Sequence, residues 1–232
     1  MYMFNYIKWV GSQLSKQGVA GWMIWLFGLA FQLGLMLGQG NVTATSLVAF
    51  VATVVGLLCT TSMMSGLPVN GILGLISAAG FIYVNWGAGH YASVVDQLVF
   101  IAFIDIPLIM TWKTWGNKVK NGVKFLKVRG WVLTVIAMLV ALPFVTMLYG
   151  YLGDTQPLWD SAILIVGATA SLYVFLGYGD SYSLWLASDA LNILLWFNAL
   201  QQGLSPASLA MLVSVLMYTF TAIYGKTHFW KR

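Results

Sequence analysis

The feature that most restricts the fold of this chain is a series of apolar runs, each about 18 to 20 residues long, that recurs along the whole sequence. A run of this length is what an α-helix needs to cross the hydrocarbon core of a bilayer. Charged residues make up only 7% of the 232 residues, whereas a soluble domain has about 25%. The sequence therefore predicts an all-α polytopic membrane protein.

Eight spans are predicted, separated by short segments rich in residues that favour turns. Their ranges are 21–38, 45–63, 70–88, 91–112, 130–150, 160–177, 183–200 and 206–225, and the breaks include GQGN at 38–41, WGAGH at 86–90 and QGLSP at 202–206. The segment MYMFNYIKWVGSQLSKQG precedes them and combines aromatic with lysine side chains. That combination suits a helix at the membrane interface. The segment lacks the small-residue cleavage site of a signal peptide.

The distribution of basic residues predicts the orientation. Of the 11 basic residues, two precede the first span, six lie between Lys113 and Arg129, and three follow the last span. Eight spans place all three groups on one side, which the positive-inside rule makes cytoplasmic. Both termini are therefore predicted to be cytoplasmic. The net charge of +5 is interpreted as this topology signal rather than as a nucleic-acid-binding surface.

An internal repeat relates the two ends of the chain. A shift of 115 residues superimposes spans two to four on spans six to eight and places Trp115 on Trp230 and Asn70 on Trp185. The result is a 1+3+1+3 plan of an extra helix, a three-helix repeat, a linker helix and a second repeat. Parallel repeats of this kind bind substrate near the midplane, at the repeat interface. The predicted divisions are 1–44 (interfacial segment and extra helix), 45–112 (first repeat), 113–158 (basic loop and linker helix) and 159–232 (second repeat and tail).

The seventh span contains a polar face. Trp185, Asp189, Asn192 and Trp196 fall within an arc of about 60° when each residue advances the helix by about 100°. A carboxylate at membrane depth costs about 3 kcal/mol on insertion scales, so it is expected to face a cavity or a partner. Two alternatives stay open: Asn and Asp side chains also join helices to one another, and tryptophans also form interfacial belts.

The third and fourth spans supply further candidate residues. The repeat places the mostly small residues Asn70, Gly74, Ser77 and Phe81 at positions equivalent to the polar face. In the fourth span, Gln97 lies about 80° from Asp105 and can share a cavity wall with it, whereas Asp96 lies about 180° away from Asp105. The predicted substrate-binding residues are Trp185, Asp189, Asn192, Trp196, Asn70, Gln97, Ser77 and Asp105.

The chemistry of these side chains predicts the class of ligand. Tryptophan faces suit a flat or cationic group, amide groups bind hydroxyls or a carboxamide, and a carboxylate favours a cation. A flat, positively charged, hydroxyl-bearing molecule fits this set.

Catalysis, a metal and a cofactor are not predicted. The single cysteine, Cys59, excludes a cysteine cluster, and the two histidines, His90 and His228, are far apart. The sequence has no GxxxxGK[ST] phosphate loop. An intramembrane enzyme is disfavoured because no two aspartates have the spacing of known acid pairs.

Short motifs resemble a known family. They are GLLC at 56–59, Asn70 with Gly74, YAS at 91–93 followed by Gln97, WDS at 159–161, and LW at 184–185 with the polar helix after it. In these motifs the chain resembles the Pnu family of bacterial vitamin transporters, whose best-known members carry nicotinamide riboside. The sequence differs from the family pattern at two places in the expected pocket. The fourth span reads FIDIPLIMTWKTW where the family has a pattern like NxYGWxxW, and Asp189 stands where relatives can have asparagine.

The resemblance implies a SWEET-like fold in the bacterial inner membrane and facilitated diffusion of nicotinamide riboside. The imported vitamin is then trapped through phosphorylation by a separate cytoplasmic kinase. It also implies a small-molecule substrate, no coupling ion and a homotrimer. A thiamine uniporter of the same family and the substrate-binding subunit of an energised importer are the alternatives.

Overall fold

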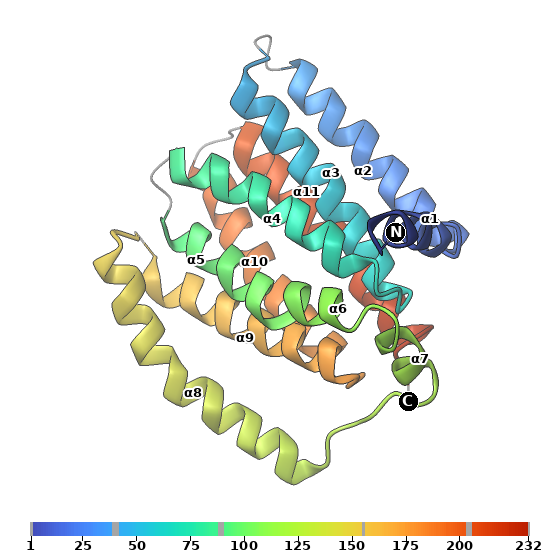
Figure 1. The fold of residues 1–232 in the computed structure, drawn as a ribbon. Coiled ribbons are helices and arrows are strands. Elements are labelled where there is room, and N and C mark those ends of the chain that lie inside the picture. Colours follow the sequence, from blue (N-terminus) through green and yellow to red (C-terminus); the bar gives the residue numbers. More distant parts are fainter. Residues whose placement is uncertain (1, 39–41, 88–90, 155, 203–205, 232) are drawn as a thin grey trace.

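The computed structural model describes residues 2–38, 42–87, 91–154, 156–202 and 206–231, and this part of the chain is almost entirely helical (Figure 1). The helices are α1 (Tyr2–Leu14), α2 (Val19–Gly38), α3 (Ala44–Met64), α4 (Asn70–Gly87), α5 (Tyr91–Phe100), the π-helical turn η1 (Ile101–Asp105), α6 (Ile106–Met110), α7 (Trp115–Lys120), α8 (Val128–Tyr151), α9 (Pro157–Leu176), α10 (Ser181–Gln202) and α11 (Pro206–Thr227). The predicted all-α fold class is confirmed.

The long helices begin and end close to the predicted spans. Five segments of the described chain are long and apolar enough to cross a membrane: Val19–Gly38, Ala44–Met64, Tyr91–Met110, Val128–Tyr151 and Pro157–Leu176. The chain is thus a multi-pass membrane protein, while the count of eight spans stays a prediction. The predicted breaks at 39–41, 88–90 and 203–205, together with His90, lie outside the described residues.

Local side-chain chemistry determines where helices start and stop. The Thr43 and Ser46 side chains form a reciprocal capping box at the start of α3, which satisfies backbone N–H groups that the helix itself cannot pair. Gly177 ends α9 with a φ of 82°, a left-handed conformation that glycine adopts without the steric cost of a Cβ.

The predicted fourth span is helical throughout, but its α-helical hydrogen bonding changes to π-helical bonding just before Pro107. Within it, the backbone N–H of Ile106 donates to the carbonyl of Ile101, five residues earlier, instead of four. Proline has no N–H to continue the α-helical ladder and its ring crowds the preceding turn. The wider π turn accommodates these constraints and ends at Asp105.

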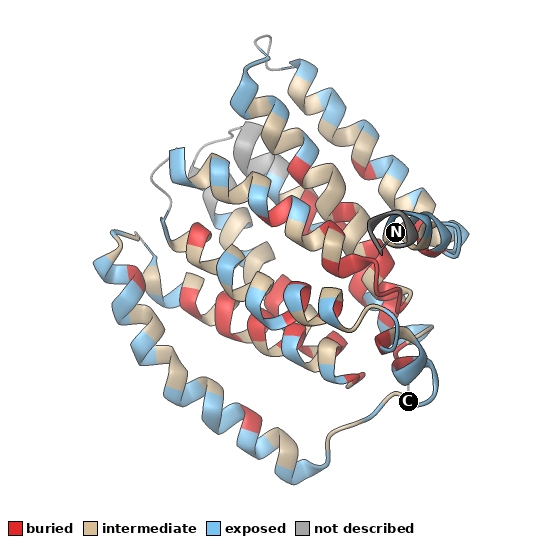
Figure 2. Ribbon diagram, viewed as in Figure 1, coloured by how far each residue is buried: buried red, intermediate tan, exposed pale blue. Residues whose placement is uncertain are grey.

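The helices divide into a central group and a periphery. Helices α3, α4, α9, α10 and α11 and the segment α5–η1 pack together, while α2 packs against α3 and α11. Helix α8 lies at the edge of the molecule, along α9 (Figure 1). Figure 2 shows that buried residues concentrate in the central helices, whereas most of α8 is exposed. Because the exposed side chains of α8 are mainly apolar, they suit contact with lipid.

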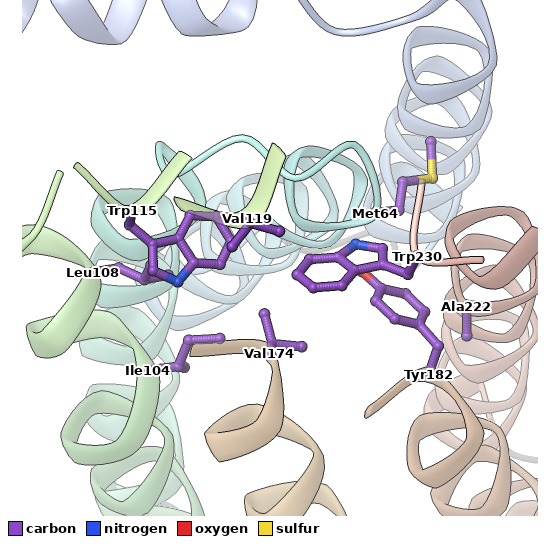
Figure 3. Packing of buried hydrophobic residues seen from close by; sticks show 9 residues of the cluster. All are labelled: Met64, Ile104, Leu108, Trp115, Val119, Val174, Tyr182, Ala222 and Trp230. Atoms are coloured by element: carbon purple, nitrogen blue, oxygen red, sulfur yellow. The ribbon is translucent and has the colours of Figure 1, made fainter. Parts of the chain in front are cut away.

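A buried aromatic cluster closes one end of the central group. Trp115 and Trp230 are almost fully buried there and their ring centroids are 6.2 Å apart. Tyr182 stacks on Trp230 at 5.5 Å, and Val119 and Val174 complete the packing (Figure 3). These two tryptophans are the pair that the 115-residue shift superimposes.

The segment that follows α7 is fixed to the turn between α9 and α10. The backbone N–H of Lys124 donates to the Gly177 carbonyl, and the N–H of Gly179 donates to the Lys124 carbonyl, both at 2.9 Å. The carboxylate of Asp180 accepts a hydrogen bond from the Leu126 N–H. These bonds hold the basic loop against the turn between α9 and α10.

Candidate substrate-binding cavity

A cavity of about 260 Å³ lies between the central helices. Ligand pockets for small molecules begin at about 300 Å³, so this volume suits a ligand of modest size. None of the lining residues found in the described chain comes from α2 or α8. The lining residues are Gly56, Cys59, Thr60 and Met63 of α3; Asn70, Gly74, Ser77, Ala78 and Phe81 of α4; Gln97, Phe100, Ile104 and Asp105 of α5–η1; Ser171 of α9; Tyr182, Trp185 and Asp189 of α10; and Tyr218, Thr221 and Ala222 of α11.

The aromatic cluster forms one end of this cavity. Ile104, Tyr182 and Ala222 belong both to the buried cluster and to the cavity lining. The cavity therefore adjoins the cluster in which Trp115 and Trp230 are buried.

Helix α4 presents one face to the cavity. Asn70, Gly74, Ser77 and Phe81 recur at helical spacing and all four line it. Gly74 provides the space for Asp105, since a Cβ at this position would overlap the carboxylate. The Ser77 hydroxyl donates to the carbonyl of Ala52 at 2.8 Å and fixes α4 against α3.

Two aromatic rings from different helices form an aromatic wall in the lining of the cavity. The rings of Phe100 and Trp185 have centroids 6.2 Å apart and an interplanar angle of 35°. Gly167 of α9 adjoins both rings; a Cβ there would lie 3.4 Å from Phe100 and 3.6 Å from Trp185. The wall offers apolar and ring surface to a ligand.

Four buried polar atoms of lining residues lack a hydrogen-bond partner within the described chain. They are Oδ1 of Asn70, Nε1 of Trp185, the hydroxyl of Tyr182 and Oδ2 of Asp189. Most buried polar groups in proteins are paired, because an unpaired one retains its full desolvation cost. Two acceptors and an indole donor are thus candidates for a ligand with hydrogen-bonding groups of its own, whereas the Tyr182 hydroxyl lies beside Trp230 in the aromatic cluster (Figure 3).

The ionisable groups that line the cavity are acids. Asp105 is 3% exposed and Asp189 is 6% exposed. The lining residues identified in the described chain include no lysine, arginine or histidine. Two carboxyl groups without a basic partner favour a positively charged ligand.

The cavity brings together six of the eight predicted binding residues. Asn70, Ser77, Gln97, Asp105, Trp185 and Asp189 line it, as does Gly74. Asn192 and Trp196 are not among its lining residues; the amide of Asn192 donates to the Ser188 carbonyl of its own helix at 3.1 Å. Substrate binding by any of the eight stays a prediction. Asp96, expected on the opposite face from Asp105, accepts a hydrogen bond from Tyr149 of α8.

Several lining residues were not among the predicted ones. Tyr182 precedes Trp185 by three residues, so the helical spacing of the polar face could have identified it. Cys59, Phe100 and Tyr218 reach the cavity only because of packing between distant helices. Thr60 bonds back to the Leu57 carbonyl at 3.0 Å, as expected of a hydroxyl in a helix, yet it also lines the cavity.

This fold and cavity define a polytopic helical membrane protein with an internal site for a small molecule. A family model described as nicotinamide mononucleotide transporter matches residues 46–232, and the chain belongs to this family of transporters. The expected membership of the Pnu family is thereby confirmed.

Two relatives agree with this assignment, and a solved structure has a similar fold. The nicotinamide riboside transporter PnuC of Neisseria mucosa is 27% identical over 186 residues, which cover 78% of this chain and 70% of the relative. The nicotinamide riboside transporter PnuC of Haemophilus influenzae is 25% identical, covering 96% of this chain and 98% of the relative. The fold is similar to a crystal structure of the vitamin B3 transporter PnuC, with a TM-score of 0.71 and 24% identity over 92% of both chains.

Proposed function

We propose that this protein transports nicotinamide riboside into the cell by facilitated diffusion, after which a separate cytoplasmic kinase phosphorylates and traps the vitamin. The two curated relatives are named as nicotinamide riboside transporters, which supports this substrate. The proposed location is the bacterial cytoplasmic membrane, with both termini in the cytoplasm.

The observation that supports the proposal most is the charge of the cavity. Asp105 and Asp189 line it, and its described lining includes no basic side chain. Nicotinamide riboside is a pyridinium cation. The mononucleotide in the family description adds a phosphate, which proteins commonly bind through arginine or lysine. The charge of the cavity therefore favours the riboside over the mononucleotide.

The neutral groups of the cavity support the same ligand. Phe100 and Trp185 offer ring surface to a flat cation. The amides of Asn70 and Gln97 can donate to and accept from ribose hydroxyls and the carboxamide. The unpartnered Oδ1 of Asn70 is an acceptor for such a hydroxyl.

The proposed architecture has the 1+3+1+3 plan. Residues 45–112 and 159–232 form the two repeats, and the helices that line the cavity come from these two ranges. The extra helix α2 and the linker helix α8 lie outside the cavity, in agreement with their proposed roles. In the membrane three copies form the homotrimer implied by the family.

Calorimetry on the purified protein tests the substrate. Nicotinamide riboside is expected to produce a saturable heat, and the mononucleotide is expected to bind at least tenfold more weakly. Thiamine is the second candidate because it is also a flat cation that two carboxyl groups can accept. A binding heat with thiamine and none with nicotinamide riboside would make thiamine the substrate. Tighter binding of the mononucleotide than of the riboside would contradict the argument from the acidic lining.

Uptake by liposomes containing this protein alone tests the mechanism. With the membrane potential held at zero, facilitated diffusion of a cation predicts uptake that stops when the internal concentration equals the external one. A substrate-binding subunit of an energised importer would give no uptake without its ATPase partner. Accumulation above the external concentration would contradict facilitated diffusion.

A further inference from the structure

Three aromatic rings join α1 to the end of a membrane-spanning segment. The ring centroids of Tyr6 and Trp9 in α1 lie 5.2 and 4.8 Å from that of Trp112. Trp112 comes two residues after Met110, where a segment long and apolar enough to cross the membrane ends. Figure 1 shows α1 nearly end-on while α2 lies along the picture, so α1 runs across the direction of the spans. The three rings therefore lie at the depth of the membrane surface, where tryptophan and tyrosine are enriched.

A second attachment fixes which face of α1 is exposed. The Gln17 side chain, which follows α1, forms hydrogen bonds with the hydroxyls of Thr61 and Ser62 near the end of α3. This attachment and the ring contacts hold one face of α1 against the protein, and the side chains of Lys8 and Lys16 are exposed. The end of α3, the end of α6 and the start of α2 thus lie close to α1.

The lysine and arginine side chains gather at this end of the molecule. In the described chain all of them are exposed, and they belong to α1 and the turn after it, to residues 113–129 and to residues 226–231. The contacts of Trp112 with α1 and of Trp115 with Trp230 hold these three segments together. A broad basic surface therefore surrounds the ends of the spans.

The six acidic residues of the chain do not form part of this surface. Asp105 and Asp189 line the cavity, and the buried Asp180 accepts a hydrogen bond from the Leu126 N–H. The others, Asp96, Asp154 and Asp160, interact with one another at the opposite end of α8. The end of the molecule that carries α1 is therefore positive, which is complementary to a negatively charged membrane surface.

We propose that α1 and the turn at Trp112 and Lys113 form a binding site for the headgroup of an anionic phospholipid. The Nζ atom of Lys113 lies 5.1 Å from the centroid of the Trp112 ring, so the cation is held beside the three rings. An ammonium group binds phosphate as a point charge. The exposed apolar side chains of Ile7 and Val19, next to the lysines of this segment, suit contact with the acyl chains.

The position of the site favours a lipid over an acidic protein. Its rings adjoin the last turn of a span, where headgroups surround the protein, instead of projecting beyond the membrane surface. The proposed orientation places this end at the cytoplasmic leaflet, whose surface is negative. The inference is independent of the substrate that the cavity transports.

Tryptophan quenching by brominated lipids tests the preference for anionic headgroups. The full chain is reconstituted into vesicles with equal amounts of phosphatidylglycerol and phosphatidylcholine, and bromine is placed on the acyl chains of one lipid or the other. We expect a relative binding constant of at least about fivefold in favour of phosphatidylglycerol, since one lysine near an anionic surface contributes about that factor. About 1 M salt, which shortens the screening length to about 3 Å, is expected to bring the ratio close to one.

Two double variants locate the site. Lys8→Gln with Lys113→Gln is expected to remove the preference. Lys127→Gln with Arg129→Gln is the matched control, because it removes the same charge from exposed residues at the start of α8. The control is expected to keep most of the preference. Equal losses in both would show a diffuse attraction without a site and would overturn the inference.

Two single variants test the site without a change of charge. Trp112→Phe is expected to reduce quenching by brominated phosphatidylglycerol more than quenching by brominated phosphatidylcholine. Trp86→Phe is the control, since this tryptophan is 64% exposed near the far end of α4 and is expected to reduce both equally. An equal effect of the two lipids in Trp112→Phe would contradict a headgroup at the rings.

Two further results would overturn the inference while leaving the proposed function intact. Equal quenching of the wild type by the two lipids at low salt would show that the surface does not select lipid headgroups, which would leave an acidic protein as its partner. Displacement of the brominated lipid by soluble glycerol phosphate would show a site for a free anion and not for a lipid.

Discussion

Trp115 and Trp230 donate their indole N–H groups crosswise to the ends of α9 and α3, the two helices that the predicted repeat superimposes. Nε1 of Trp115 bonds to the carbonyl of Phe175 at 2.8 Å, and Nε1 of Trp230 bonds to the carbonyl of Met63 at 3.2 Å. Phe175 and Met63 are the penultimate residues of α9 and α3. The Met63 carbonyl also accepts from the Gly66 N–H at 3.0 Å. Trp115 thus attaches α7 to the end of α9, and Trp230 attaches the segment after α11 to the end of α3.

Trp115→Phe and Trp230→Phe test this crossed arrangement. Each change keeps an aromatic ring but removes one hydrogen bond, which contributes about 1 kcal/mol. The apparent melting temperature of the purified protein is expected to fall by about 2–4 °C for each variant. Trp86→Phe is the matched control because that tryptophan is 64% exposed. A loss as large in the control as in the two variants would show that the crossed bonds contribute nothing.

Gly74→Ala tests the space reserved for Asp105. The added Cβ overlaps the carboxylate and displaces it, so nicotinamide riboside affinity is expected to fall by at least tenfold. Overpacking of this kind also costs about 1–3 kcal/mol of stability. Gly34→Ala in α2 is the control, since a Cβ there meets nothing within 4 Å in the described chain. Unchanged binding by Gly74→Ala, measured by calorimetry on folded protein, would remove Asp105 from the site.

Trp185→Ala and Trp196→Ala divide the predicted polar face into two parts. Trp185 lines the cavity with an unpartnered Nε1, whereas Trp196 is not among the lining residues. The first change is expected to weaken binding by about 5- to 30-fold, since stacked aromatic and cationic groups contribute about 1–2 kcal/mol. The second is expected to leave affinity within about twofold. If both variants lost affinity equally, Trp196 would belong to the binding site, and the cavity would extend further along α10 than its lining residues indicate.

Asp189→Asn tests whether charge or shape makes this residue important. The change keeps the size of the side chain and removes its negative charge. We expect the affinity for cationic nicotinamide riboside to fall by at least tenfold and the affinity for its uncharged dihydro form to change little. Titration of both ligands into the wild type and the variant measures the difference. Equal weakening of the two would indicate a structural role for Asp189.

Gln17→Leu tests how the interfacial segment is attached. Nε2 of Gln17 donates to the hydroxyl of Thr61, and its Oε1 accepts from the hydroxyl of Ser62, both at 3.1 Å. Leucine leaves two buried hydroxyls of α3 without these partners, which costs about 1–3 kcal/mol. A lower melting temperature with unchanged substrate affinity is expected. Gln201→Leu is the comparison, as that side chain is exposed.

The positions of the helices and one face of the cavity were predictable from sequence because both depend on local periodicity. Glycine, proline and short polar breaks separate the apolar runs, and the equivalent positions 70, 74, 77 and 81 form a single helical face. The face of α10 was predicted only in part. Helical spacing gives the direction of Asn192 and Trp196 but not the depth at which the cavity ends, since that depth depends on neighbouring helices.

The remaining cavity residues depend on contacts between segments far apart in the chain. Phe100 of α5 meets Trp185 of α10, and Cys59 of α3 bonds through its thiol to the Asn70 carbonyl. No pattern within one helix specifies such pairs. The π turn could not be predicted either. Pro107 indicates that the α-helical hydrogen bonding is interrupted, but not whether a bend or a wider turn accommodates the proline.

The π turn has a consequence for the cavity. Because the hydrogen-bond ladder changes spacing between Ile101 and Asp105, the segment from Tyr91 to Met110 consists of two α-helical stretches joined by a wider turn. Gln97 and Phe100 belong to the first stretch, whereas Asp105 lies at the end of the turn, beside Gly74. The Phe100 ring and the Asp105 carboxyl group thus reach one cavity from differently wound parts of the same span.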